Sequence, residues 1–258
     1  MRKPMKNHQL NEKHLFALHH TDLIEEIGSA SVGKEVIIAD PDLAHRVVSI
    51  LRLSVGESFI LFDRNIHATV SLSGSVKNKL VKVILSEKNK NSRALPEIIF
   101  LLPLLKKEAL ETAFYSLTEM GITTIQLIDT QKSQQRWGQK EFERAQKIII
   151  AAAEQSKNFC YPQLHAPQSI SSSLDKLPRE SKKLFFDPAG VHIALPLAEL
   201  KNAKLPIILA IGPEGDLTAQ EKELLKQTGF TFSALTPTIL RACQAAALAA
   251  GILRSYLR

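Results

Sequence analysis

The chain of 258 residues has few of the features that mark secreted, membrane-spanning or metal-binding proteins. It contains two cysteines, Cys160 and Cys243, which lack metal-ligand spacing and cannot form a disulfide framework, so a reducing compartment is expected. No apolar run approaches the roughly 20 residues of a membrane span, and residues 1–12 are polar, without a signal-like apolar core. We therefore expect a cytoplasmic protein that does not enter a membrane.

Two glycine-rich nucleotide motifs are also missing. Neither Gly-x-Gly-x-x-Gly nor Gly-x-x-x-x-Gly-Lys-Ser/Thr occurs in the chain, which argues against a nicotinamide-dependent enzyme and against a nucleoside triphosphatase. His14, His19 and His20 lie close together, but without a cysteine or carboxylate at the usual ligand spacing. We interpret them as surface histidines and expect no metal.

The chain has fewer acidic residues than basic ones, 26 Asp and Glu against 33 Lys and Arg. The formal net charge is +7 and the isoelectric point is near 9.4, which fits a polyanionic partner, although it equally fits a mildly basic protein without one. Hydrophobic residues make up 45% of the chain, enough for the core of one large domain or, as fits better, two modest ones.

The most informative segment runs from residue 205 to residue 215. Residues 207–211 form a continuous apolar run, as expected for a parallel strand that is covered on both faces. In the turn that follows, Gly212 and Gly215 permit backbone angles closed to other residues, and Pro213 stiffens it. Thr218 and Glu221 have the spacing of a capping box that opens a helix. This is the pattern of a ligand loop, with an ordinary strand-to-helix connection as the alternative.

The first third of the chain has the pattern of a small β-barrel. Strand-like runs at residues 35–39, 58–62 and 80–85 are separated by Gly, Asn and Asp turn signals. One helix, at about residues 42–53, interrupts them. A polar stretch at residues 87–93 then predicts a linker.

Beyond the linker, expected strands alternate with expected helices, which predicts a parallel sheet with helices on both faces. The strands are expected at residues 98–102, 122–128, 184–187, 207–211 and 230–235. The helices are expected at residues 106–120 and 141–156 and in the Ala-rich segment near the C-terminus.

Two segments taken together resemble a known family. Ile-Gly-Pro-Glu-Gly at residues 211–215 and Leu-x-Pro-x-Ile-Leu-Arg at residues 235–241 resemble the bacterial 16S ribosomal RNA (uracil-N3)-methyltransferases of the SPOUT superfamily. Residues 45–57 resemble the family's N-terminal block, with Arg46 in place of its second histidine. Thr118-Glu-Met-Gly-Ile and Ala152-Ala-Glu-Gln resemble two further family segments in the same order.

The resemblance implies an α/β fold with two domains. Residues 1–90 would form a PUA-like β-barrel that binds RNA, and residues 91–258 a SPOUT methyltransferase domain whose parallel sheet contains a trefoil knot. S-adenosyl-L-methionine would bind among the three knot loops, without a metal. The cofactor-binding residues carried over from the family are Asp187, Pro188, Ile211, Gly212, Pro213, Glu214, Gly215, Leu235, Pro237, Ile239 and Leu240.

Methylation of N3 of uracil requires alignment of the ring nitrogen with the methyl group and stabilisation of the charge that develops on the uracil oxygens. Arg241 matches the family position that would stabilise this charge, with a surface ion pair as the alternative. Glu154 matches a family carboxylate that positions the base or orients an arginine, with solvation on a helix surface as the alternative. Glu214 would contact a partner subunit or hold its loop.

RNA contacts are expected on both domains. His45, Arg46, Arg52 and Lys132 are the candidates, although Arg52 could equally pair with a buried carboxylate. Family members are homodimers, and the small residues of 245–251 are compatible with close helix approach. The expected partners are therefore 16S ribosomal RNA in the small ribosomal subunit and a second copy of the chain.

Departures from the family pattern cluster at the expected site. They keep a second hypothesis open, namely an RNA-binding protein of the same fold whose methyl transfer is weakened or lost. The departing positions are Ser116, Lys132, Asn158, Asp216, Thr236, Thr238, Ala242, Cys243 and Gln244.

Overall fold

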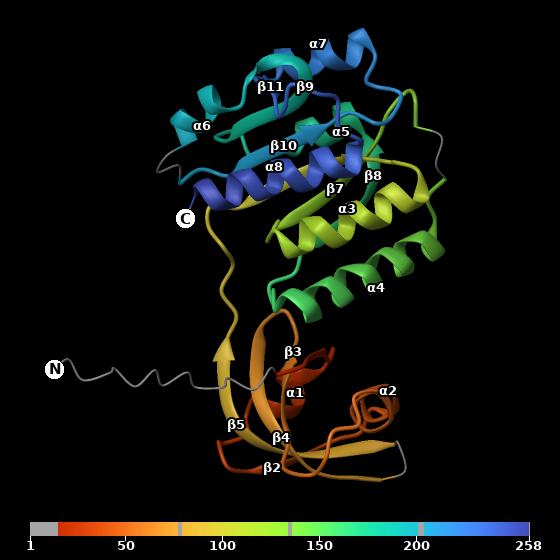
Figure 1. Cartoon of the computed structure of the whole chain (residues 1–258), viewed down its shortest axis with the longest axis vertical. Coiled ribbons are helices and arrows are strands. Elements are labelled where there is room, and N and C mark those ends of the chain that lie inside the picture. The colour runs from red at the N-terminus through yellow and green to blue at the C-terminus, as the bar shows by residue number, and fades with distance from the viewer. Residues whose placement is uncertain (1–14, 77–78, 134–135, 201–203, 258) are drawn as a thin grey trace, which may run out of the picture. The chain divides into compact units, whose positions relative to one another are not determined.

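The computed structural model describes residues 15–76, 79–133, 136–200 and 204–257. The chain divides into two compact units, Met1–Asn89 and Lys90–Arg258, whose elements are labelled in Figure 1. His14 and the polar residues before it lie outside the described residues. Within the described residues, no helix has the length and apolar character needed to cross a membrane.

The N-terminal unit is built on a five-stranded, barrel-like sheet, as predicted. Strand β3 is parallel to β1 and antiparallel to β4, while β5 is antiparallel to β2. Alternate residues of β3, such as Phe59 and Leu61, are fully buried because successive side chains of a strand point to opposite faces. The strand order is β1 (Ala17–His19), β3 (Ser58–Phe62), β4 (Ile66–Val76), β5 (Leu80–Lys90) and β2 (Glu35–Ile38).

The single helix predicted at residues 42–53 was wrong in its extent. The α-helix α2 (Pro41–His45) begins at Asp40, whose side chain accepts hydrogen bonds from two backbone amides, and passes directly into the π-helical turn η1 (Arg46–Ile50). Arg52 then takes a left-handed backbone conformation with a φ of 53°, which ends the helix. The apolar pattern could not distinguish a π-turn from an α-helix.

Two further expectations for this unit were wrong. The predicted linker begins too early, because β5 continues to Lys90 and the Lys88 ammonium donates to carbonyls at the end of α1 (Leu23–Ile27), including Ala30 O at 3.1 Å. His20 is buried rather than at the surface. Its Nδ1 lies 3.1 Å from Asp40 Oδ2 and its Nε2 2.9 Å from Glu26 Oε2, so two carboxylates compensate for its burial.

The C-terminal unit is a mixed α/β fold around a six-stranded parallel sheet, which confirms the predicted fold class. Each paired strand in it runs parallel to its neighbours. The trefoil knot that the family resemblance implies remains an expectation. The strand order is β11 (Thr231–Ala234), β9 (Lys182–His192), β10 (Ile207–Ile211), β6 (Ile98–Pro103), β7 (Thr124–Asp129) and β8 (Gln163–Ser169).

Helices cover both faces of this sheet. The long helices α3 (Lys107–Glu119), α4 (Gln139–Ser156) and α8 (Ala242–Tyr256) lie together on one face in Figure 1. The other face packs against α5 (Ile170–Asp175) and α7 (Ala219–Gln227). The fully buried central strand β10 contributes alternate side chains to the two cores, Ile207, Leu209 and Ile211 to one and Ile208 and Ala210 to the other.

Several elements were not predicted, including β4, although its Ile66, Ala68, Val70 and Leu72 are buried and alternate with polar residues. They comprise β1, α1 and β4 in the first unit, and β8, α5 and α6 (Ala194–Leu200) in the second. Strand β8 carries an irregular burial pattern and polar residues, because it lies at the edge of the sheet beside β7 only. Its identity as a strand comes from its pairing with β7, not from its own sequence.

Candidate active site

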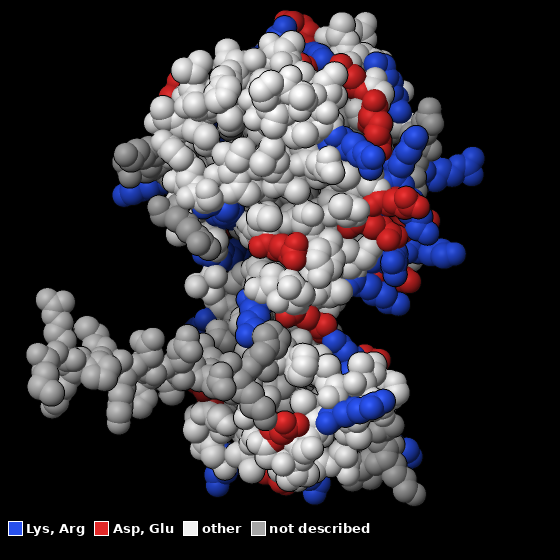
Figure 2. Space-filling view, in the orientation of Figure 1, with Lys and Arg blue, Asp and Glu red and all other residues white. Residues whose placement is uncertain are grey.

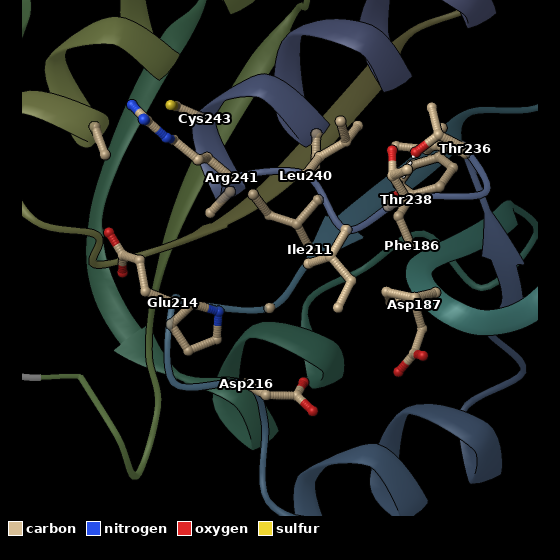
Figure 3. Close-up of a pocket in the computed structure, with 18 of the residues that line it drawn as sticks. Phe186, Asp187, Ile211, Glu214, Asp216, Thr236, Thr238, Leu240, Arg241 and Cys243 are labelled. Atoms are coloured by element: carbon tan, nitrogen blue, oxygen red, sulfur yellow. Dashed lines mark hydrogen bonds between the residues drawn. The ribbon is translucent and has the colours of Figure 1, made fainter.

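A cavity of about 870 Å³ lies where β10 and β11 end, beside the middle of β9. Its wall comes from four segments that are distant in the sequence: the middle of β9, the loop after β10, residues 235–245, and the first turns of α3 with the residue before it. Figure 3 shows Ile211 and Leu240 near its centre, and Asp187 and Asp216 away from Arg241. Ligands of open α/β sheets commonly bind at the carboxyl ends of the strands.

The loop after β10 is held by contacts from three directions. The Pro213 carbonyl accepts a hydrogen bond from Asp216 N at 2.9 Å, which closes a tight turn. The Glu214 carboxylate accepts from Lys106 N at 3.2 Å, which ties the loop to the start of α3. On the far side of the loop, Lys132 Nζ donates to Gly215 O at 2.7 Å. The loop is therefore fixed before any ligand binds.

The proposed reason for the two glycines of this loop was wrong. Neither Gly212 nor Gly215 has a positive φ, whereas Asp216 does, with a φ of 60°. The family resemblance places a further glycine at position 216. Glycine adopts a left-handed backbone at the lowest cost, and aspartate tolerates it better than most other residues. Gly212 instead permits close approach, since a Cβ there would lie 3.3 Å from Asp216 Oδ1.

An ion network joins this loop to strand β9. Lys222 of α7 donates Nζ to Asp187 Oδ2 and to Asp216 Oδ2, at 2.7 Å in both cases. Burial acts to raise the pKa of Asp187, but hydrogen bonds from Lys222 and from Ala189 N outweigh it, so this pKa lies below its usual value. Burial likewise acts to lower the pKa of Lys222, and the two carboxylates reverse the effect and raise it.

The strand predicted to end at residue 187 continues as β9 to His192. The strand is irregular there, and its register against β11 shifts between Phe232 and Ser233. Gly190 makes this possible, because a Cβ on it would lie 2.4 Å from Ser233 N. The close backbone approach brings the β9 wall of the cavity next to the segment that follows β11.

The third wall is the segment that leads into α8. Thr236 Oγ1 donates to Thr238 O at 2.7 Å and tightens the turn around Pro237. Ile239 is 84% exposed, whereas Leu240 is half-buried in the cavity wall. Arg241 is exposed and occupies the N-cap position of α8, where no side chain caps the helix. The buried Cys243 follows in the first turn and also lines the cavity.

Most of the residues predicted from the sequence meet at this cavity. Glu154 does not line it: this side chain is half-buried in the last turn of α4 and has an interaction of its own. Gly215, Pro237 and Lys132 also fall outside the lining, although the first two belong to its loops. The predicted residues that do line the cavity are Asp187, Pro188, Ile211, Gly212, Pro213, Glu214, Leu235, Ile239, Leu240 and Arg241.

The residues predicted to contact RNA do not line the cavity. His45, Arg46 and Arg52 are in the N-terminal unit, in or just after α2 and η1, where His45 and Arg52 are exposed. Lys132 is exposed in the C-terminal unit, beside the loop after β10.

Several lining residues were missed by the sequence reasoning. Phe186 could have been inferred, because it directly precedes the predicted site residue Asp187 in the strand predicted at residues 184–187. The residues from α3 carry no such signal, since only the tertiary fold brings this helix to the ends of the strands. The missed residues are Lys106, Glu108, Ala109, Thr112, Phe186 and Ala245. Among the described residues, no group of three His, Cys, Asp or Glu side chains could hold a metal ion.

Curated relatives of similar length share low but extended identity with this chain. A protein of Synechocystis named ribosomal RNA small subunit methyltransferase E is 27% identical over 83% of this chain and 71% of its own length. A protein of Rickettsia conorii with the same name is 28% identical over 83% of this chain and 87% of its own length.

Solved structures share the fold of the whole chain. A ribosomal RNA small subunit methyltransferase E from Neisseria gonorrhoeae, bound to S-adenosyl methionine, superposes with a TM-score of 0.82 at 22% identity, over 95% of this chain and 98% of that one. A putative methyltransferase from Legionella pneumophila, also with bound cofactor, gives a TM-score of 0.80 at 24% identity, over 94% and 98% of the two chains. The model of the RNA methyltransferase domain matches residues 92–254, which include every segment of the cavity wall, and this chain therefore belongs to the RNA methyltransferase domain family.

Proposed function

We propose that this chain transfers a methyl group from S-adenosyl-L-methionine to N3 of a uridine in 16S ribosomal RNA of the small ribosomal subunit. The observation that carries the proposal is the single cavity on which residues 211–214 and 235–241 converge, since these are the two segments with the strongest family resemblance. The names of the relatives support ribosomal RNA as the substrate. The choice of uracil N3 rests on the resemblance of the site.

The cavity fits the proposed cofactor in size and character. Its volume of about 870 Å³ lies within the usual range for small-molecule sites, and apolar side chains such as Ile211, Leu235 and Leu240 line it beside charged and polar ones such as Asp187 and Thr238. When bound, the cofactor would supply an electrophilic methyl group on a sulfonium. The protein side chains would hold the adenosine against the apolar wall and exclude water from the reacting atoms.

Arg241 is the proposed catalytic residue. Its side chain is exposed at the rim of the cavity, and the uncapped start of α8 adds backbone amides and the positive end of a helix dipole at the same place. Both features favour negative charge, which develops on the uracil carbonyls as N3 loses its proton. Glu154 lies outside the cavity lining, so we assign it an orienting role rather than contact with the base.

The N-terminal unit, corresponding to residues 1–90, is the proposed PUA-like RNA-binding domain. In Figure 2, Lys and Arg side chains are spread over both units among Asp and Glu, which suits a broad phosphate surface rather than one basic groove. His45, Arg46 and Arg52 cluster around the π-turn of this unit and are proposed to contact the RNA, together with Lys132 of the second unit.

A homodimer is also proposed. The Ala-rich helix α8 leaves Leu248 and Tyr256 partly exposed, at 36% and 38%. In the shared orientation of Figures 1 and 2, α8 lies at the front of the C-terminal unit, where much of the surface is uncharged. Such a face suits a second copy of the chain. A cytoplasmic location would follow from ribosomal RNA as the substrate.

The rival proposal is an RNA-binding protein whose methyl transfer is weak or lost. It is favoured by Thr236, Thr238 and Cys243, because the family has a glycine, an arginine and a glutamate at these positions of the cavity wall. Both proposals predict RNA binding, and only the first predicts turnover.

Calorimetry followed by a methyl-transfer assay separates the two. The intact chain should bind S-adenosyl-L-methionine and transfer its labelled methyl group to small subunits from cells that lack the protein. Replacement of His45, Arg46 and Arg52 by glutamate should abolish transfer while leaving cofactor affinity unchanged, since the two functions would reside in different units. Cofactor binding without any transfer would support the rival, and no binding at millimolar cofactor would eliminate the enzyme.

A further inference from the structure

Lys222 bridges two walls of the cavity just beyond the last paired residues of β9 and β10, Phe186 and Ile211. Asp187 belongs to strand β9 and Asp216 to the loop after β10, and the two residues line the cavity on the side away from Arg241 (Figure 3). The Lys222 ammonium reaches both carboxylates from α7, outside the cavity. One side chain therefore links the two walls where the strand pairing no longer does.

We infer that Lys222 is a positioning residue for cofactor binding, which acts by clamping Asp187 to Asp216. The inference rests on the proposed function, because it assumes that the cavity takes S-adenosyl-L-methionine. Nothing in the RNA methyltransferase family match assigns a role to this lysine.

The geometry separates Lys222 from residues that contact a ligand directly. Both aspartates line the cavity, but Lys222 does not. Its Nζ is already hydrogen-bonded to two carboxylate oxygens, and its side chain is only 25% exposed. A ligand would therefore contact the aspartates and the backbone around them, while the lysine holds those groups in place.

The second oxygen of each carboxylate fixes the backbone of its own wall. Asp187 Oδ1 accepts from Ala189 N at 2.8 Å, and Asp216 Oδ1 accepts from Leu217 N at 2.7 Å. Each aspartate thus links the shared ammonium to its local main chain. Loss of the ammonium would release two like charges next to each other and loosen both walls together.

The backbone of Asp216 indicates that the Asp187–Lys222–Asp216 network does more than stabilise the fold. Its φ of 60° is a conformation that glycine adopts at lower cost than aspartate, by about 1 kcal/mol. An aspartate at this position therefore retains a strained backbone in exchange for a carboxylate that reaches Lys222. Replacing Asp216 by glycine relieves the backbone strain and removes the carboxylate that binds Lys222. A structural role predicts that stability falls, whereas a positioning role predicts that only cofactor affinity falls.

The test is calorimetric titration of the full-length chain with S-adenosyl-L-methionine, beside thermal unfolding without ligand. Lys222→Met should weaken cofactor affinity about tenfold, and Lys222→Arg, which keeps a donor for both carboxylates, should stay within about threefold of wild type. Lys140→Met is the matched control, because Lys140 is exposed in the first turn of α4, away from the cavity. At saturating cofactor, the turnover of Lys222→Met should equal that of wild type, so that the loss appears in KM.

Asp216→Gly keeps the inference testable even if Lys222→Met unfolds. This variant should unfold at the same or a higher temperature than wild type and still bind the cofactor about tenfold more weakly. Wild-type affinity in Asp216→Gly, or in a folded Lys222→Met, would overturn the inference while leaving the proposed function intact. A wild-type chain that does not bind the cofactor would instead overturn the proposed function and this inference with it.

Discussion

Helices α7 and α8 both begin beside the cavity, but their first turns are built differently. At the start of α7, Thr218 Oγ1 accepts from Glu221 N at 3.3 Å and the Glu221 carboxylate accepts from Thr218 N at 2.8 Å. At the start of α8, Arg241 occupies the N-cap position without a side-chain hydrogen bond to the helix. One helix start is thus closed by its own side chains, and the other is left open.

The backbone does not account for this difference. The φ and ψ of Arg241 are −62° and 148°, close to the −70° and 161° of Thr218 and to the −57° and 154° of Ser169, whose side chain caps α5. A serine at position 241 would therefore find the geometry of a cap already in place. We propose that the amides at the start of α8 are left for a ligand, since a capping residue would fit the same backbone.

The largest expected effect comes from removing the guanidinium at the open helix start. Arg241→Ala should lower the rate of methyl transfer by about 100- to 1000-fold, because a group that stabilises developing charge acts mainly in the transition state. Cofactor affinity should change by less than about threefold. Initial rates with radiolabelled cofactor measure this effect, with the exposed Arg179→Ala as the control. Equal losses in affinity and rate would show that Arg241 is structural.

The opposite end of α8 should behave in the opposite way. The Arg254 guanidinium donates to Gly121 O at 2.6 Å and to Pro96 O at 2.9 Å, and burial lowers its pKa to about 10, so it remains charged at neutral pH. Arg254→Met should lower the free energy of unfolding by about 3 kcal/mol, because two carbonyls lose a charged donor. Turnover of the folded fraction should be unchanged.

Chemical denaturation measures the loss at Arg254. Arg144→Met is its control, because Arg144 forms an ion pair with Glu111 while 60% exposed and should change stability by less than about 1 kcal/mol. If the two variants were equally stable, α8 would not be anchored at its C-terminal end as described.

The capping box at the start of α7 should affect stability but not turnover. Glu221 is buried and also accepts from Gln131 N at 2.8 Å, so Glu221→Ala leaves three donors without a partner. We expect the free energy of unfolding to fall by about 2 kcal/mol, with turnover maintained below the transition. Glu223→Ala, on the exposed side of the same helix, is the matched control in thermal unfolding. A loss of turnover without a loss of stability would contradict the comparison.

The smallest expected change in stability is also the most distinctive. Arg241→Ser should raise the free energy of unfolding by about 1 kcal/mol, since it supplies the missing cap of α8, yet it should lose methyl transfer as Arg241→Ala does. Denaturation and rate measurements on the same preparation test both parts. A destabilised Arg241→Ser would mean that the start of α8 is not open to capping.

The sequence identified the parts of the site that local chemistry determines. The strand at 207–211, the capping box at Thr218 and the Leu235–Arg241 segment are each encoded within a few residues, and the structure confirms the strand and the capping box. The contribution of α3 depends on long-range packing. The role of Asp216 was missed because a left-handed φ in a non-glycine residue has no sequence signature of its own.

The central claim is that the open start of α8 serves methyl transfer to uracil N3 in small-subunit ribosomal RNA. Mass mapping of that RNA from cells lacking the protein, complemented with wild type or with Arg241→Ser, tests it most directly. The account predicts that one 3-methyluridine is absent without the protein, returns with wild type and does not return with the more stable Arg241→Ser. An unchanged 3-methyluridine in the deleted cells, or its full restoration by Arg241→Ser, would contradict the account.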